Sequence, residues 1–271
     1  MTLLWIALLG ALALGLGVFA WHSRREARRL SERLERAAVE LQNLQMGFSR
    51  FAPDDVIEKI IADGTADIGE KKEVTVLFAD LVGFTAMSES TPPTVVVRIL
   101  NGYFERMSQA ITSQRGYVST FIGDGILALF GSMVPNPWQG NDAVHAALDM
   151  RRAVTAYNEE LAGEGLPALS LGIGLERGTG IAGLVGSRRL KEFTFVGGTV
   201  NVAARVQDLT RVHPADIIVT QTLRDSLDPR FQLRALPDTF VKGIEKPIAI
   251  YAVDGFDKDG QLGESKVAGA R

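Results

Sequence analysis

Two runs of β-forming residues in this chain end in an aspartate, and glycine-bearing turn residues follow each of them directly. The first run ends at Asp80, and the second ends at Asp124, which stands between two glycines. Two carboxylates that a fold brings together at strand ends repel each other unless a cation neutralises them. Because Mg²⁺ prefers one or two carboxylates together with water and phosphate oxygens, the pair predicts a site for a divalent cation and a polyphosphate.

The segments around these aspartates alternate between strand and helix patterns. We expect strands over 73–79, 117–122, 126–130, 169–175 and 192–196, and helices over 94–114, 141–161 and 199–209. The strands on either side of residues 123–125 form a hairpin whose tip places Asp124 beside Asp80. This order predicts an α+β sandwich in which helices cover an antiparallel sheet.

A second cluster of polar residues lies downstream of the hairpin. There a Gly197-Gly198 turn leads into a helical segment that carries Asn201 and Arg205. Residues four apart share one face of a helix, so both side chains are expected to point the same way. They are candidates for contacts with a nucleotide.

Three glycines upstream of that cluster, Gly178, Gly180 and Gly183, match the pattern G-x-G-x-x-G. A dinucleotide fingerprint requires a helix that opens at the third glycine and an acidic residue about 20 positions further on. Here residues 184–186 continue the run, and Gly197 stands near the place of the acid. We therefore interpret the segment as a glycine-rich hairpin.

Length and composition limit the possible functions. The chain has 271 residues, of which 46% are hydrophobic, and this suits one globular domain with additional elements. The net charge is -3 and no basic face is evident, so nucleic acid is not an expected partner. The absence of cysteine excludes disulfides, a thiolate nucleophile and cysteine-ligated zinc.

The amino-terminal segment predicts a membrane anchor. Residues 3–21 are uncharged and almost wholly apolar, which is long enough to cross a bilayer as a helix. Six arginines follow between residues 24 and 36, so the positive-inside rule places the rest of the chain in the cytoplasm. A cleaved signal peptide is the alternative, but a basic n-region is missing and the run is long for an h-region. We expect a single-pass cell-membrane protein with its anchor at residues 1–22.

The segment after the anchor predicts a parallel dimer. Its apolar positions alternate steps of four and three: Leu30, Leu34, Ala37, Leu41, Leu44, Phe48 and Phe51. This period of 3.5 is typical of a two-stranded coiled coil, which we assign to residues 23–52. An amphipathic helix packed on its own domain is the alternative. Pro53 ends this helix, and residues 53–72 are expected to form a short helix and a linker.

The two aspartates, the Gly-Gly turn and the Asn201–Arg205 pair together resemble the class III nucleotidyl cyclases, the adenylate and guanylate cyclases. The resemblance runs from about Glu73 to about Val253. It implies a ferredoxin-like sandwich as the catalytic domain, over residues 73–256, with residues 257–271 as a flexible tail. It also implies a homodimer, held by the coiled coil and the catalytic domain, because members of this family place the metal residues of one subunit opposite the asparagine and arginine of the other.

The resemblance assigns roles to these residues. Two Mg²⁺ or Mn²⁺ ions are held by Asp80, Asp124 and the backbone carbonyl of Leu81. Asn201 orients the ribose, and Arg205 neutralises the charge that develops on the α-phosphate, which suits a planar guanidinium.

The phosphate groups are expected to meet two further parts of the chain. Lys242 contacts the distal phosphates, and the backbone amides of Val82, Gly83, Phe84 and Thr85 complete the cradle.

The sequence constrains the choice of the nucleotide base less than it constrains the metal and phosphate contacts. The two positions that read the base in relatives are Thr120 and Thr194, and neither carries a charge. Guanine requires a carboxylate to accept its N1 and N2 protons, so ATP is the expected substrate and cyclic AMP with pyrophosphate the expected products. The alternatives are a cyclase of relaxed or different base choice, acting on GTP or a pyrimidine triphosphate, and a degenerate nucleotide-binding module that regulates a partner. A membrane protein is a further candidate partner, as the source of the activating signal.

Overall fold

The computed structural model describes residues 69–187, 191–240 and 247–257. The described strands are β1 (Glu70–Leu81), β2 (Tyr117–Ile122), β3 (Gly125–Phe130), β4 (Leu171–Gly186), β5 (Lys191–Val196), β6 (Ile217–Thr220), β7 (Phe231–Ala235) and β8 (Ile250–Phe256). The helices are α3 (Phe84–Ser90), α4 (Pro93–Ser113), α5 (Gln139–Gly163), α6 (Gly198–Asp208), η1 (Leu209–Arg211) and α7 (Gln221–Arg224).

The strands form a single sheet in the order β2-β3-β1-β4-β6-β8-β7, and β5 pairs with β4 beside this path. Neighbouring strands run antiparallel except β4 and β6, which are parallel. The central strand β1 buries Val74, Val76 and Leu77 completely, because helices cover both faces of the sheet at this point. The expected antiparallel-rich α+β sandwich is thus confirmed for the described residues.

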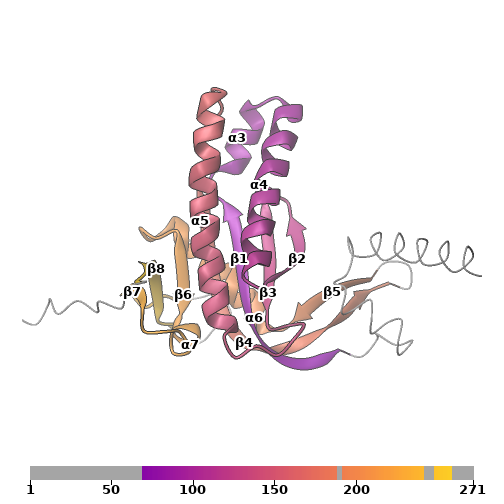
Figure 1. The fold of residues 1–271 in the computed structure, drawn as a ribbon, viewed down its shortest axis with the longest axis vertical. Coiled ribbons are helices and arrows are strands. Elements are labelled where there is room, and N and C mark those ends of the chain that lie inside the picture. Colours follow the sequence, from indigo (N-terminus) through magenta and orange to yellow (C-terminus); the bar gives the residue numbers. More distant parts are fainter. Residues whose placement is uncertain (1–68, 188–190, 241–246, 258–271) are drawn as a thin grey trace, which may run out of the picture. The chain divides into compact units, whose positions relative to one another are not determined.

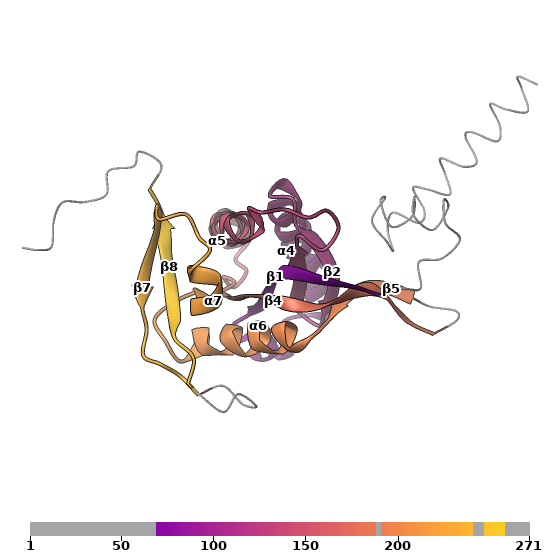
Figure 2. The ribbon, with the colours of Figure 1, turned by 90° about the horizontal axis from the view of Figure 1, so that it is seen from below.

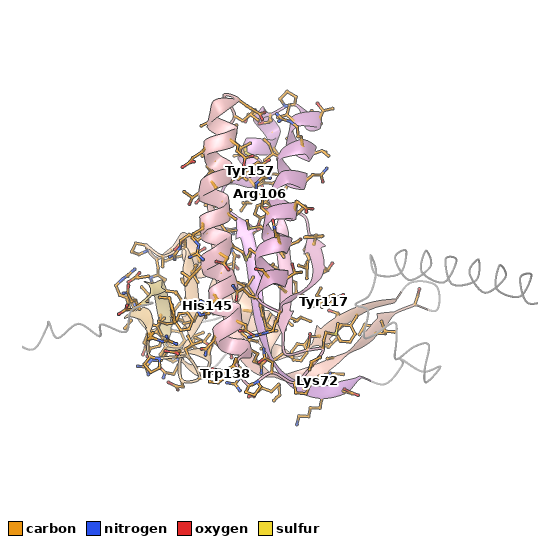
Figure 3. All side chains as sticks on the ribbon, in the orientation of Figure 1. Lys72, Arg106, Tyr117, Trp138, His145 and Tyr157 are labelled. Carbon is orange, nitrogen blue, oxygen red and sulfur yellow. The ribbon has the colours of Figure 1, made fainter. Side chains whose placement is uncertain are left out.

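The two long helices α4 and α5 pack side by side against one face of the sheet (Figure 1). Their apolar side chains and those of β1, β3 and β4 form the main core, in which Ile99, Met107 and Ile173 are fully buried. Between the two helices, the guanidinium of Arg106 on α4 lies 4.2 Å from the centre of the Tyr157 ring on α5 (Figure 3). Cation–π contacts of this kind add modestly to the packing of two helices.

The helix α6 covers the opposite face of the sheet, so that β1 and β4 lie between it and α5 (Figure 2). Its buried residues are Thr199, Ala203, Val206 and Gln207. The approach to β4 is very close at Gly174, where an added Cβ would lie 2.2 Å from the backbone nitrogen of Gln207. Only glycine at this position allows α6 to rest on the strand.

The glycine-rich stretch at residues 178–183 lies within β4, which pairs with β5 in a hairpin from Ile181 onward. The interpretation as a hairpin, rather than as a dinucleotide fingerprint, is therefore confirmed. The strand predicted at 169–175 is correspondingly longer, since it continues to Gly186. The predicted strands at 73–79, 117–122, 126–130 and 192–196 and the predicted helices at 94–114, 141–161 and 199–209 match described elements.

Some elements of the structure were not predicted, and some predictions concern residues that the structure does not describe. The short helix α3 and the elements after residue 211 had no counterpart among our expectations. The predicted membrane span, the coiled coil, the part of the predicted 53–72 segment up to residue 68 and the tail beyond residue 257 lie outside the described residues. The end of the predicted linker is corrected, since residues 70–72 belong to β1. Within the described part of the chain, no helix has the length and apolar character needed to traverse a bilayer.

Candidate active site

The two predicted metal ligands come together at one edge of the sheet. Asp80 is the penultimate residue of β1, and Asp124 lies in the tight turn between β2 and β3. The pairing of Ala79 with Ile126 sets that turn beside the end of β1. The backbone amide of Leu81 donates to Asp124 Oδ2 at 3.3 Å, which fixes the second carboxylate next to the first.

The electrostatics of this edge favour a cation. Burial, followed by the charge of Asp124 and a hydrogen bond with it, raises the pKa of Asp80 to about 6, although Arg211 and the backbone at Leu81 act in the opposite direction. The fully buried hydroxyl of Tyr103 on α4 has a raised pKa from burial and then from the same two carboxylates. A divalent ion would relieve the repulsion between the two aspartates.

The residues present fit a magnesium or manganese ion. Both ligands are hard oxygen donors on rigid elements, and both side chains are half-buried, so solvent and a phosphate group can reach them. In the described ranges, no group of three or more His, Cys, Asp or Glu side chains is placed to hold a metal. A site with two carboxylates suits Mg²⁺, which keeps several waters and takes its remaining ligands from substrate phosphates.

The expected phosphate cradle is partly corrected. The amide of Val82 donates to the carbonyl of Ser170 at 2.7 Å, so it is not available to a phosphate. Gly83 precedes α3 with a left-handed backbone (φ 74°), and Phe84 and Thr85 begin the helix. The first amides of a helix have no acceptor within it, so the cradle predicted for Gly83, Phe84 and Thr85 is compatible with the structure.

Asn201 and Arg205 lie on the face of α6 that points away from the sheet, opposite the buried face at Ala203. The predicted common face is thus confirmed. Among the described residues, no side-chain hydrogen bond or ion pair joins either of them to Asp80 or Asp124. Their side chains are presented outward, where a second subunit can be reached.

The two predicted base-reading residues belong to β2 and β5, which pair with different strands of the sheet but are linked by a serine hydroxyl. The β2–β3 register shifts between Val118 and Thr120, which makes Ser119 a bulge residue. Its hydroxyl lies 3.3 Å from the carbonyl oxygen of Phe193 and 3.2 Å from the hydroxyl of Thr194. The Ser119 hydroxyl is the donor in both contacts, so the Thr194 hydroxyl accepts here and keeps its own proton and a second lone pair for a base.

Sequence reasoning did not identify Arg211. This residue ends the η1 turn after α6, and one of its guanidinium nitrogens lies 2.5 Å from Asp80 Oδ2. A second nitrogen lies 3.3 Å from Asp208 Oδ1. No signal in the sequence marks this arginine, because its partner at the site lies 131 residues away. Lys242, the remaining predicted phosphate ligand, lies outside the described residues.

This fold and this carboxylate pair define a nucleotidyl cyclase catalytic domain. The chain belongs to the family described as the adenylate and guanylate cyclase catalytic domain, whose model matches residues 67–255.

Individual relatives agree with this assignment. An adenylate cyclase of Anabaena cylindrica is 34% identical over 237 residues, which cover 83% of this chain and 46% of the relative. Adenylate cyclase 1 of Rhizobium meliloti is 27% identical over 77% of this chain and 32% of its own length. The chain therefore spans less than half the length of these two curated relatives.

Solved structures show the same fold. The guanylyl cyclase Cya2 superposes with a TM-score of 0.67 and 32% identity, over 72% of this chain and 98% of that one. A bacterial light-regulated adenylyl cyclase superposes with a TM-score of 0.69 and 26% identity, over 82% of this chain and 64% of that one.

Proposed function

We propose that this chain is a membrane-anchored, homodimeric adenylate cyclase that converts ATP to 3′,5′-cyclic AMP and pyrophosphate. The observation that carries the proposal is the convergence of Asp80 and Asp124 at the end of β1, held together by the amide of Leu81. Two neighbouring carboxylates, one of which, Asp80, has a raised pKa, are costly to a fold that has no use for them. A site for metal-bound triphosphate accounts for their retention.

The reaction proposed is an in-line displacement at phosphorus. The ribose 3′-oxygen forms a bond to the α-phosphorus, the bond to the oxygen that bridges to the β-phosphorus breaks, and the hydroxyl proton passes to water. When bound, divalent ions would lower the pKa of the 3′-hydroxyl and neutralise the phosphates.

The protein residues position the groups that react. Asp80, Asp124 and the carbonyl of Leu81 would hold the two Mg²⁺ or Mn²⁺ ions. Asn201 would orient the ribose, and Arg205 would donate to the equatorial oxygens of the α-phosphate as charge builds there.

A complete site requires two chains in this proposal. Asn201 and Arg205 project from the outer face of α6, away from their own sheet. The apolar side chains of Phe121 and Ile122, at the hairpin beside Asp124, are 47% and 55% exposed. Exposed apolar groups at the rim of a site favour coverage by another subunit, and the coiled coil predicted over 23–52 would hold the pair together.

Coexpression tests this shared site directly. Asp80→Asn and Arg205→Ala chains are each inactive as homodimers, but a mixed dimer contains one site in which both residues are intact. We expect cyclic AMP formation from coexpressed chains and none from either variant alone. Inactivity of verified mixed dimers would contradict the shared site.

The first test of the activity itself is a product assay. The purified full-length chain is incubated with ATP, GTP, CTP or UTP in Mg²⁺ or Mn²⁺, and any cyclic nucleotide is identified by mass. We expect cyclic AMP, and its loss in Asp80→Asn. The matched control is Asp254→Asn, which removes an exposed carboxylate that is paired with Arg234 at 3.1 Å on β7. Absence of product from all four nucleotides in a verified dimer would favour the regulatory-module alternative.

A cyclase of relaxed base choice is a second candidate. It is favoured by the lack of charge at Thr120 and Thr194 and by the likeness to a guanylyl cyclase structure. The Thr194 hydroxyl can both donate and accept, so it can meet the amine that adenine offers at N6. The ratio of kcat/KM for ATP and GTP decides between the two.

The membrane location is a separate part of the proposal. It depends on the apolar run at residues 3–21 and the arginines that follow it. We expect the full-length chain in the membrane fraction after alkaline washing, with the cyclase domain accessible to protease from the cytoplasmic side. Release of the chain by the wash would contradict the anchor.

A further inference from the structure

A positive side chain is placed directly against one of the proposed metal ligands. A guanidinium nitrogen of Arg211 lies 2.5 Å from Asp80 Oδ2. Asp80 is the less accessible partner, with 21% of its side chain exposed, whereas 44% of the Arg211 side chain is exposed. The pair is therefore an ion pair at the inner edge of the site, formed by an arginine that can move without unpacking the core.

This arginine and a divalent cation compete for the same place. An Mg²⁺ ion bound to a carboxylate sits about 2.1 Å from the oxygen, and the guanidinium occupies that side of Asp80 Oδ2. Two cations next to one carboxylate also repel each other strongly at such short range. Entry of the metal at this oxygen therefore requires Arg211 to leave it.

Asp208 offers Arg211 an alternative ion-pair partner. The second guanidinium nitrogen already lies 3.3 Å from Asp208 Oδ1, three residues earlier in the chain. The Asp208 side chain is 64% exposed. A small rotation of the side chain would transfer Arg211 fully to Asp208 and free Asp80.

We propose that Arg211 is the resident counter-ion of the Asp80–Asp124 pair and exchanges with the divalent cation, so that it sets how tightly the site binds metal. The inference rests on the proposed function, because it takes the two aspartates as metal ligands. It assigns to Arg211 a positioning role: the residue pairs with Asp80 whenever no ion is bound there and is displaced by the ion.

Metal binding without nucleotide tests the inference. The purified full-length chain is stripped of metal and titrated with Mn²⁺, and free Mn²⁺ is measured by electron paramagnetic resonance. In the wild type the metal must break a partly exposed ion pair worth about 1 kcal/mol. Arg211→Gln lacks this pair and should therefore bind Mn²⁺ about fivefold tighter than the wild type. Arg211→Lys keeps the charge, so its affinity should stay near that of the wild type.

The control variant is Arg234→Gln, which breaks an ion pair of similar exposure, with Asp254, far from the carboxylates. Its Mn²⁺ affinity should equal that of the wild type. Equal or weaker Mn²⁺ binding by Arg211→Gln overturns the inference, and so does binding by Arg211→Lys as tight as by Arg211→Gln. If Asp80→Asn leaves Mn²⁺ binding unchanged, the metal assignment and the proposed function themselves fail, which is a different result.

Discussion

Replacement of Gly174 by alanine should displace the helix that carries the proposed nucleotide contacts. The added Cβ would lie 2.2 Å from the backbone nitrogen of Gln207 and 2.4 Å from the backbone oxygen of Ala203. These are atoms of the helix backbone, so no side chain can rotate away to make room. Carbon atoms prefer separations of about 3.5 Å or more, so α6 must recede by about 1.3 Å.

The magnitude follows from overpacking. Insertion of a methyl group into a tightly packed interface costs about 1 to 3 kcal/mol. For a domain of this size, each kcal/mol lowers the melting temperature by about 2 to 4 °C, so we expect a decrease of about 2 to 12 °C. Since Asn201 and Arg205 move with α6, a displacement near 1 Å should also reduce turnover about 100-fold.

The assay compares thermal unfolding and cyclic AMP formation of the full-length wild type and variant. Gly163→Ala, at the end of α5, is the matched control because an added Cβ there meets nothing within 4 Å. That change should leave turnover unaltered and stabilise the fold slightly, by about 0.4 to 1 kcal/mol. If Gly174→Ala melts and turns over like the wild type, the close contact between α6 and β4 does not exist as described.

Three further changes test other parts of the structure. Burial raises the pKa of Glu176, which accepts a hydrogen bond from Thr220, to about 7 from an ordinary 4.5. The protonated form of Glu176 therefore contributes to folding stability fully below pH 4.5, and this contribution is lost as the pH rises through 7. The free energy of unfolding of Glu176→Gln should therefore exceed that of the wild type at pH 8 by up to about 3 kcal/mol. The variant should melt at a higher temperature there, and the difference in melting temperature should vanish towards pH 4.5. Ser119→Ala removes the hydroxyl that donates to Thr194, so Thr194 loses a contact that holds it in place and the ratio of kcat/KM for ATP over GTP should fall; an unchanged ratio would refute a role of this contact in base choice. Arg205→Lys should lower kcat about 100-fold or more with little change in KM, because the guanidinium acts on charge that develops in the transition state; a rise in KM alone would indicate a binding role instead.

The sequence alone predicted those features of the fold and the site that depend on local interactions. Asp80 ends a strand, and Asp124 sits in a tight turn between two strands, so the period of the strands and the glycines of the turn predict their convergence. The shared face of Asn201 and Arg205 follows likewise from helical spacing alone. The strand end, the turn and the helix face each depend on residues only a few positions apart, and the pairing of β1 with β3 then brings the two aspartates together.

Features that depend on distant segments were missed. The extension of β4 through its glycines was not predicted, because glycine has low β propensity and the strand is stabilised here by its partners β1 and β5. The amide of Val82 is occupied by the carbonyl of Ser170, which no local pattern indicates. The contact between Arg211 and Asp80 likewise exists only in the folded chain.

The continuous segment from α6 into η1 has a consequence for the proposed dimer. Arg205, near the middle of this segment, would act on the nucleotide held by the opposite subunit, whereas Arg211, at its end, contacts the aspartate of its own subunit. In the proposed dimer, one short helical segment would thus carry a residue for each of the two reaction centres. Metal binding at one centre would detach Arg211 and leave the segment that carries Arg205 less restrained at its end, so the two centres would be coupled without any further residue.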